Sequence, residues 1–78
     1  MMNREDKVVM VWGRVKEYLR VYLGMEVKVG NSVPFDRVVE GIMAVRGIDD
    51  RTVRKWLREF QLNKCIKYVH PNRFLILR

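Results

Sequence analysis

The sequence contains few of the residues from which metal sites, disulfides and catalytic groups are made. It has one cysteine, Cys65, and one histidine, His70. A lone cysteine closes no disulfide within the chain, which favours a reducing, intracellular (cytoplasmic) setting, and we expect Cys65 to be a small core hydrophobe. These two residues also supply too few conventional ligands for a tetrahedral zinc site. We therefore expect neither a metal nor another cofactor.

Motifs for nucleotide binding, redox chemistry and membrane insertion are missing as well. The chain has no Gly-x-x-x-x-Gly-Lys-Ser/Thr loop, no Gly-x-Gly-x-x-Gly turn and no Cys-x-x-Cys pair. Its longest apolar run is Val8 to Trp12, far short of the roughly 20 residues that span a bilayer. Glu5 and Asp6 place acid where a signal peptide needs positive charge. We expect a protein that is not an enzyme and is not held in a membrane.

Acidic residues are scarce in one half of the chain. The 78 residues, of which 49% are hydrophobic and 32% charged, suit one small globular domain over 1–78, with a net charge of +7. Residues 1–45 hold seven basic and six acidic residues, whereas residues 46–78 hold nine and three. This imbalance favours a polyanionic partner, with nucleic acid ahead of an anionic membrane. Abundant Arg, Val and Met with few Gln point to a thermophile or one of its viruses.

The first half of the chain is expected to form two helices and a strand. Spacings of three and four predict a helix over about 5–23, capped by Asn3 or Asp6 and stopped by Gly24. Alternation over Met25–Val29 predicts a short strand that closes in a turn at 30–32. A second helix is expected from about Pro34 to Gly47, with one apolar face. That face consists of Phe35, Val38, Val39, Ile42 and Met43.

The second half is expected to form a helix and a hairpin. Ile48 is placed to pack back on the preceding helix, and Asp49 or Asp50 can cap a third helix over roughly 50–61. Two β-rich runs, Cys65–Val69 and Phe74–Leu77, flank a turn at residues 70–73. Three short strands must pack against the helices, so the sequence predicts an α+β domain of order α-β-α-α-β-β.

The third helix carries the clearest functional signal. On a helical wheel its apolar residues occupy an arc of about 100°, and three cations lie on the opposite side, with Arg54 and Thr52 at the edges and Glu59 as an interruption. The apolar residues are Val53, Trp56, Leu57 and Phe60, and the cations are Arg51, Lys55 and Arg58. Solvated helix faces usually mix charge signs, because like charges three or four residues apart repel. This face is therefore expected to contact an anion, and its place after a tight turn is typical of a helix-turn-helix.

Two segments resemble the recognition half of winged helix-turn-helix proteins, small single-domain members of an archaeal or archaeal-virus type. They are residues 47–60, GIDDRTVRKWLREF, and residues 65–69, CIKYV. In that family a short Gly-Ile/Leu-x-x-x-Thr-Val entry opens the recognition helix, and a strand then leads into a β-hairpin wing. Asn63-Lys64-Cys65 stands where many members have a glycine before the wing. The resemblance implies a winged helix fold for the whole chain.

The resemblance also implies a double-stranded DNA partner and a set of contact residues. The helix at about 50–61 would enter the major groove, where Arg can fork to guanine and Thr52 can meet a base edge, while edge cations such as Arg54 and Arg58 hold phosphates. The hairpin at about 65–77 would lie on the adjacent backbone or minor groove. The implied DNA-binding residues are Arg51, Thr52, Arg54, Lys55, Arg58, His70, Asn72 and Arg73.

Two functions stay open at this point. One is a transcriptional regulator, nucleoid-associated if cellular, that binds DNA, and the other is a winged-helix module that binds proteins without DNA. Met10 and Val21 lie about 20° apart on the first helix, outside its core arc, and favour a protein surface or a homodimer through that helix. A role in RNA binding comes third, since stacking aromatics for single strands are wanting.

Overall fold

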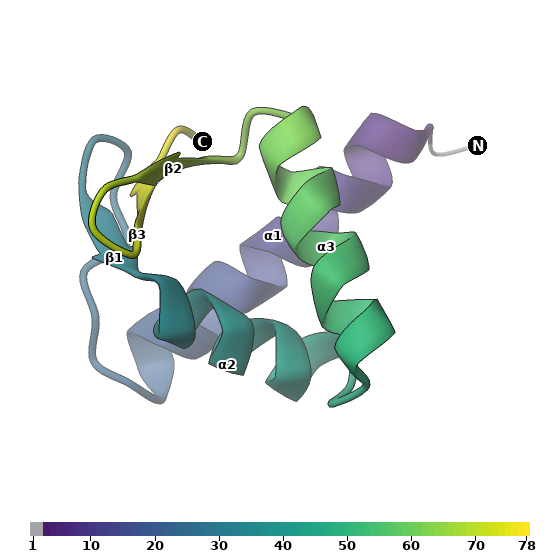
Figure 1. Cartoon of the computed structure of the whole chain (residues 1–78), viewed down its shortest axis with the longest axis horizontal. Helices are drawn as coiled ribbons and strands as arrows, with labels where there is room; N and C mark the ends of the chain where they lie inside the picture. The colour runs from purple at the N-terminus through teal and green to yellow at the C-terminus, as the bar shows by residue number, and fades with distance from the viewer. Residues whose placement is uncertain (1–2) are drawn as a thin grey trace.

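The computed structural model describes residues 3–78 as three helices packed on a small antiparallel sheet (Figure 1). The helices are α1 (Arg4–Val21), α2 (Phe35–Arg46) and α3 (Asp50–Leu62). The strands are β1 (Ser32–Pro34), β2 (Ile66–Val69) and β3 (Arg73–Ile76). The predicted α+β class and the order α-β-α-α-β-β are confirmed.

Local capping fixes the two ends of α1. The side chain of Asn3, not Asp6, caps the helix by accepting a hydrogen bond from the Asp6 N–H at 2.8 Å. The helix ends two residues earlier than expected, at Val21. Gly24 then adopts φ +62°, and the N–H of the next residue returns to the Leu19 carbonyl at 3.0 Å. This positive φ explains why glycine is suited to the stop.

The strand predicted at residues 25–29 is wrong. That segment pairs with no strand in the described part of the chain, and β1 lies instead at 32–34, where a turn and a helix start were expected. Val33 is buried opposite Phe74 of β3, whereas Val29 is 67% exposed. Val27 packs against the core from an irregular segment. Met25 and Val27 face the core but Val29 does not, so the alternation in this region matched the burial of only part of the segment and did not indicate backbone pairing.

β3 is the central strand of the sheet, in the order β1-β3-β2. The predicted hairpin is confirmed, with Ile66 opposite Ile76 and a turn at residues 70–72. Asn72 adopts φ +50° within that turn, and its carbonyl accepts the Phe35 N–H at 2.8 Å. This bond joins the hairpin turn to the first residue of α2.

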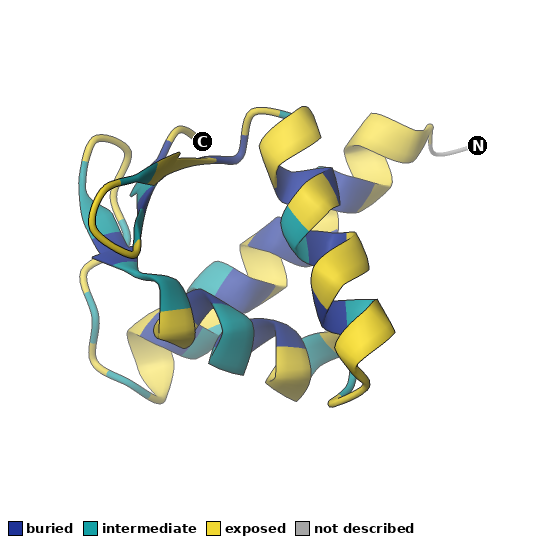
Figure 2. Ribbon diagram, viewed as in Figure 1, coloured by how far each residue is buried: buried dark blue, intermediate teal, exposed yellow. Residues whose placement is uncertain are grey.

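The hydrophobic core lies between the three helices and the inner face of the sheet (Figure 2). Trp12 of α1 and Trp56 of α3 lie in this core and are 1% and 3% exposed. Cys65 is fully buried, as expected. α1 and α2 cross so closely that a Cβ atom on Gly41 would lie 2.8 Å from Cγ1 of Val15.

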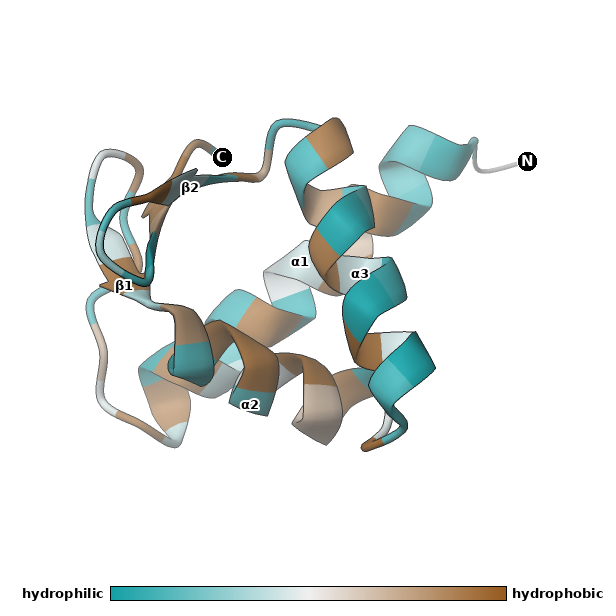
Figure 3. Ribbon diagram, in the orientation of Figure 1, coloured by the Kyte–Doolittle hydropathy of each residue, from teal (hydrophilic) through white to brown (hydrophobic). Residues whose placement is uncertain are grey.

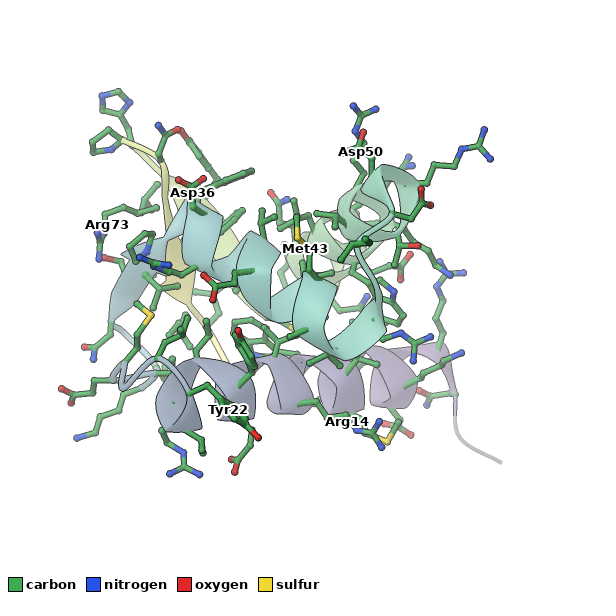
Figure 4. All side chains as sticks on the ribbon, turned by 90° about the horizontal axis from the view of Figure 1, so that it is seen from below. Arg14, Tyr22, Asp36, Met43, Asp50 and Arg73 are labelled. Atoms are coloured by element: carbon green, nitrogen blue, oxygen red, sulfur yellow. The ribbon has the colours of Figure 1, made fainter. Side chains whose placement is uncertain are left out.

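The connection between α2 and α3 differs from its prediction. Ile48 was expected to pack back on α2, yet it is 82% exposed. Gly47 has φ +129° and ψ 161°, a positive-φ conformation that favours glycine but differs from the left-handed helical one of a Schellman turn. Asp49 is the N-cap residue of α3, but its side chain makes no capping bond. Met43, predicted to be in the core, is 38% exposed and points outward from α2 (Figure 4).

Candidate nucleic-acid interface

The two sides of α3 are as different in the structure as the sequence predicts. The core side consists of Val53, Trp56 and Phe60, none more than 6% exposed. Arg51, Lys55 and Arg58 are exposed on the opposite side. The outward side of the helix is accordingly exposed in Figure 2 and hydrophilic in Figure 3. The predicted separation of apolar and cationic side chains onto opposite sides of the helix is confirmed.

Most of these cations lack an acidic partner. Across residues 3–78, no carboxylate oxygen lies within 4 Å of the charged nitrogens of Arg51, Lys55 or Arg58. Arg54 differs, because it pairs with Asp50 one helical turn earlier at 2.9 Å. The structure thus leaves three unneutralised cations on α3 and one neutralised cation at its edge. We name the three, Arg51, Lys55 and Arg58, the α3 cation face.

Glu59 does not interrupt this face. It was expected on the exposed side, but it is 6% exposed and accepts two hydrogen bonds from Arg4 of α1, one of them from Nε at 3.1 Å. The hydrogen bond from Arg4 holds the pKa of the Glu59 carboxyl below its ordinary value, with further help from nearby Lys55 and Arg58. The carboxylate therefore stays ionised, directed toward α1.

The end of α2 adds a cation that the sequence pattern did not indicate. The guanidinium of Arg46 lies 5.1 Å from the centre of the Trp56 ring, and the ammonium of Lys55 lies 5.5 Å from it. Such cation–π contacts hold the two charges beside one aromatic surface. Arg46 thereby extends the α3 cation face toward α2. Sequence spacing gave no sign of this, because the contact crosses from one helix to another.

A groove borders the other flank of α3. It has a volume of about 470 Å³ and lies between α3 and the first residue of α2. Its lining is Phe35, Arg54, Leu57, Arg58, Gln61 and Leu62. Leu62 is 66% exposed there, and it falls about 20° from Arg51 on the helical wheel. The groove therefore combines apolar side chains with two arginines.

The hairpin turn and α3 lie on the same side of the molecule, away from α1 (Figure 4). The three residues expected to act at this turn have different surroundings. His70 is exposed. Asn72 is tied to Tyr68, whose hydroxyl lies 3.2 Å from Asn72 Oδ1 and accepts the Asn72 N–H at 3.1 Å. These bonds give Asn72 a role in shaping the turn.

Arg73 is engaged inside the sheet. Its Nε donates to Oγ of Ser32 at 2.8 Å, and its Nη2 donates to the Ser32 carbonyl at 2.9 Å. Figure 4 shows Arg73 far from Asp50, the first residue of α3. The structure therefore does not bring Arg73 together with the α3 cation face, and its guanidinium holds β1 to β3.

Comparisons with protein-family models, with curated proteins and with solved structures find no match to this chain. The described residues contain no group of three His, Cys, Asp or Glu side chains placed to hold a metal ion. Within residues 3–78, none of the helices combines the length and the apolar character needed to cross a membrane. The α3 cation face is the most distinctive chemical feature of this surface.

Proposed function

We propose that the chain is a winged helix-turn-helix domain that binds double-stranded DNA as a transcriptional regulator. In this proposal α2 and α3 are the helix-turn-helix, α3 is the recognition helix, and the β2–β3 hairpin is the wing. The order of elements and the central position of β3 in the sheet support this view. So does the position of the hairpin turn on the same side of the molecule as α3.

The observation that carries the proposal is the α3 cation face. Its members are three, four and seven residues apart, so they repel one another at a cost of a few tenths of a kcal/mol for each near pair. DNA phosphates would offset that repulsion. A helix about 10–12 Å across fits a major groove about 12 Å wide.

The proposed contacts are of two kinds: some recognise base edges, and others position the protein on the phosphate backbone. Arg51 lies at the middle of the exposed face and would meet base edges, where Arg forks to the O6 and N7 atoms of guanine. Lys55 lies beside it, on the side of α3 that faces α1. Thr52 flanks them and would contact a base edge or a phosphate. Arg54 and Arg58 border the groove beside α2 and would hold phosphates.

The wing would contact the adjacent backbone or minor groove chiefly through His70. Asn72 and Arg73 belong to the proposed interface as residues that shape it, because their polar atoms bind Tyr68 and Ser32. This assignment makes the wing a weaker contributor than α3.

The test is duplex affinity measured by fluorescence anisotropy over a range of salt concentrations. The double variant R51A/K55A should bind more weakly and lower the salt slope by about one to two units. The control is R20A/K28A, which removes the same charge from exposed residues paired with Glu17 and Glu26. Equal affinity of the two variants would refute the proposal. Selection from randomised duplexes then separates sequence-specific binding from architectural binding.

A protein-binding role without DNA is the alternative, and one observation favours it. The groove beside α3 exposes Leu62 together with part of Phe35. A second copy bound through α1 has less support, because Arg14 and Glu17 separate the exposed Met10 and Val21 along that face. The absence of duplex binding in the titration would favour this alternative. Sedimentation would show whether the chain associates with itself.

A further inference from the structure

The first turns of α1 lie against the flank of α3 that faces away from the hairpin, and a small hollow opens between them. Its volume is about 170 Å³. It is lined by Arg4, Lys7, Val8, Lys55, Trp56 and Glu59. Three of these six side chains are cationic and one is acidic, so the hollow carries a net charge of +2.

The cations of the hollow differ in their partners. Arg4 is bound to Glu59, whereas Lys7 and Lys55 have no carboxylate within 4 Å in the part of the chain that the structure describes. The side chains of Val8 and Trp56 form apolar walls. Apolar walls lower the local dielectric and strengthen the attraction of the two lysines for an anion.

The position of the hollow relative to the α3 cation face suggests which anion it takes. On the helical wheel Lys55 and Glu59 lie about 40° and 80° to one side of Arg51, and Arg54 lies about 60° to the other side. A helix inside a major groove about 8.5 Å deep has a phosphate backbone along each flank. Arg54 and Arg58 flank one side, and the hollow flanks the other.

We propose that the hollow binds a backbone phosphate of duplex DNA through Lys7 and Lys55, a contact that rests on the DNA-binding function proposed above. The Lys7 ammonium extends the interface from α3 onto α1 and supplies a contact on the strand opposite the one held by Arg54 and Arg58. The duplex is then held on both sides of the recognition helix, which fixes its orientation.

Glu59 has a defined part in this site. Its carboxylate holds Arg4 in place and neutralises it, so Arg4 contributes little net charge to the hollow. Replacement by glutamine keeps an oxygen that can accept a hydrogen bond from Arg4 but removes the negative charge. The Glu59→Gln variant should therefore bind duplex more tightly, a gain that a purely structural role for Glu59 would not produce.

The experiment compares single-charge variants in the salt titration described above. Lys7→Ala should lower the salt slope by about one unit and weaken binding about eightfold at 0.1 M salt, the loss of one phosphate contact. Lys28→Ala removes the same charge from an exposed residue paired with Glu26 and should change affinity less than about twofold. Glu59→Gln should strengthen binding and steepen the slope. Thermal unfolding of each variant confirms that it is folded at the temperature of the titration.

The outcomes separate the two proposals. If R51A/K55A weakens binding but Lys7→Ala matches Lys28→Ala, the phosphate contact in the hollow is refuted and the DNA-binding function stands. If the unaltered chain binds no duplex, both proposals fail. Free inorganic phosphate is the alternative ligand, because it offers the hollow the same anionic oxygens as a DNA phosphate. If inorganic phosphate shifts the Trp56 indole N–H signal in NMR spectra while duplex does not, the hollow is a small-anion site and the proposal is overturned.

Discussion

Two helical glycines provide a sharp test of how α1 and α2 pack. Gly41 of α2 is buried, and a Cβ atom there would lie 2.8 Å from Cγ1 of Val15 and 3.6 Å from Cδ2 of Leu19. Gly13 of α1 is exposed, and a Cβ atom there would meet nothing within 4 Å. The same substitution, glycine to alanine, should therefore have opposite effects on stability at the two positions.

The expected magnitudes follow from two effects. Alanine is favoured over glycine in a helix interior by about 0.8–1 kcal/mol at either position. At Gly41 the helices must also separate, or Val15 must move, by about 0.6 Å to restore an ordinary contact of 3.4 Å. Val15 is β-branched and buried, so it moves with difficulty, and overpacking of this kind costs about 1–3 kcal/mol. Gly13→Ala should thus stabilise the protein by about 1 kcal/mol, and Gly41→Ala should destabilise it by up to about 2 kcal/mol.

Urea and thermal unfolding followed by circular dichroism measure both changes. A shift of 1 kcal/mol corresponds to about 4–8 °C in the midpoint for a domain of this size. Val15→Ala provides a further control, because the cost of Gly41→Ala should shrink in that background if Val15 is the neighbour that resists. Equal or greater stability of Gly41→Ala relative to Gly13→Ala would refute the close crossing of the two helices.

Three further predictions concern single side chains. The lowered pKa of Glu59 means that its ion pair with Arg4 adds stability above the ordinary carboxyl value of 4.5 and loses it as pH falls through the lowered value. The stability difference between the unaltered chain and Glu59→Gln should therefore vanish on acidification, as pH-dependent urea unfolding would show. Arg73→Ala should cost about 1–3 kcal/mol in urea unfolding, because it removes two hydrogen bonds to Ser32; a neutral result would contradict a structural role. Burial raises the pKa of the Cys65 thiol, so a thiol reagent should react only as the chain unfolds, and rapid labelling in native buffer would be inconsistent with that burial.

Strong local periodicity made the helices and the hairpin predictable. Each of these elements repeats its apolar pattern over several residues, and Gly24 and Gly47 mark ends that the structure places close by. β1 gave no such signal. It is three residues long, it lies between Gly30 and the start of α2, and its hydrogen-bonding partner is β3 near the other end of the chain. Three residues are too few to show a period of two.

The candidate site was predictable only where it lies on one element. Arg51, Lys55 and Arg58 share a face because of helical geometry alone, so the sequence was sufficient to place them together. The contact of Arg4 with Glu59 joins residues 55 positions apart, and that of Arg73 with Ser32 joins residues 41 apart. Both contacts depend on how the helices and strands pack, and a periodic pattern within one element contains no information about that.

Under the proposed DNA-binding function, protein stability and DNA affinity should respond to salt in opposite directions because of the α3 cation face. Repulsion among its unpaired cations disfavours the folded chain, and salt screens that repulsion, so added salt should raise the unfolding temperature. Salt weakens duplex binding, because each counterion released from the DNA gains less entropy when the bulk salt concentration is higher. Arg51→Ala should accordingly gain a few tenths of a kcal/mol in stability while it loses affinity. If this face were merely exposed to solvent, nothing would favour three unpaired cations on it, since one glutamate in place of Lys55 would relieve the repulsion. The opposite signs are therefore the behaviour expected of a surface whose charges are neutralised by a polyanion.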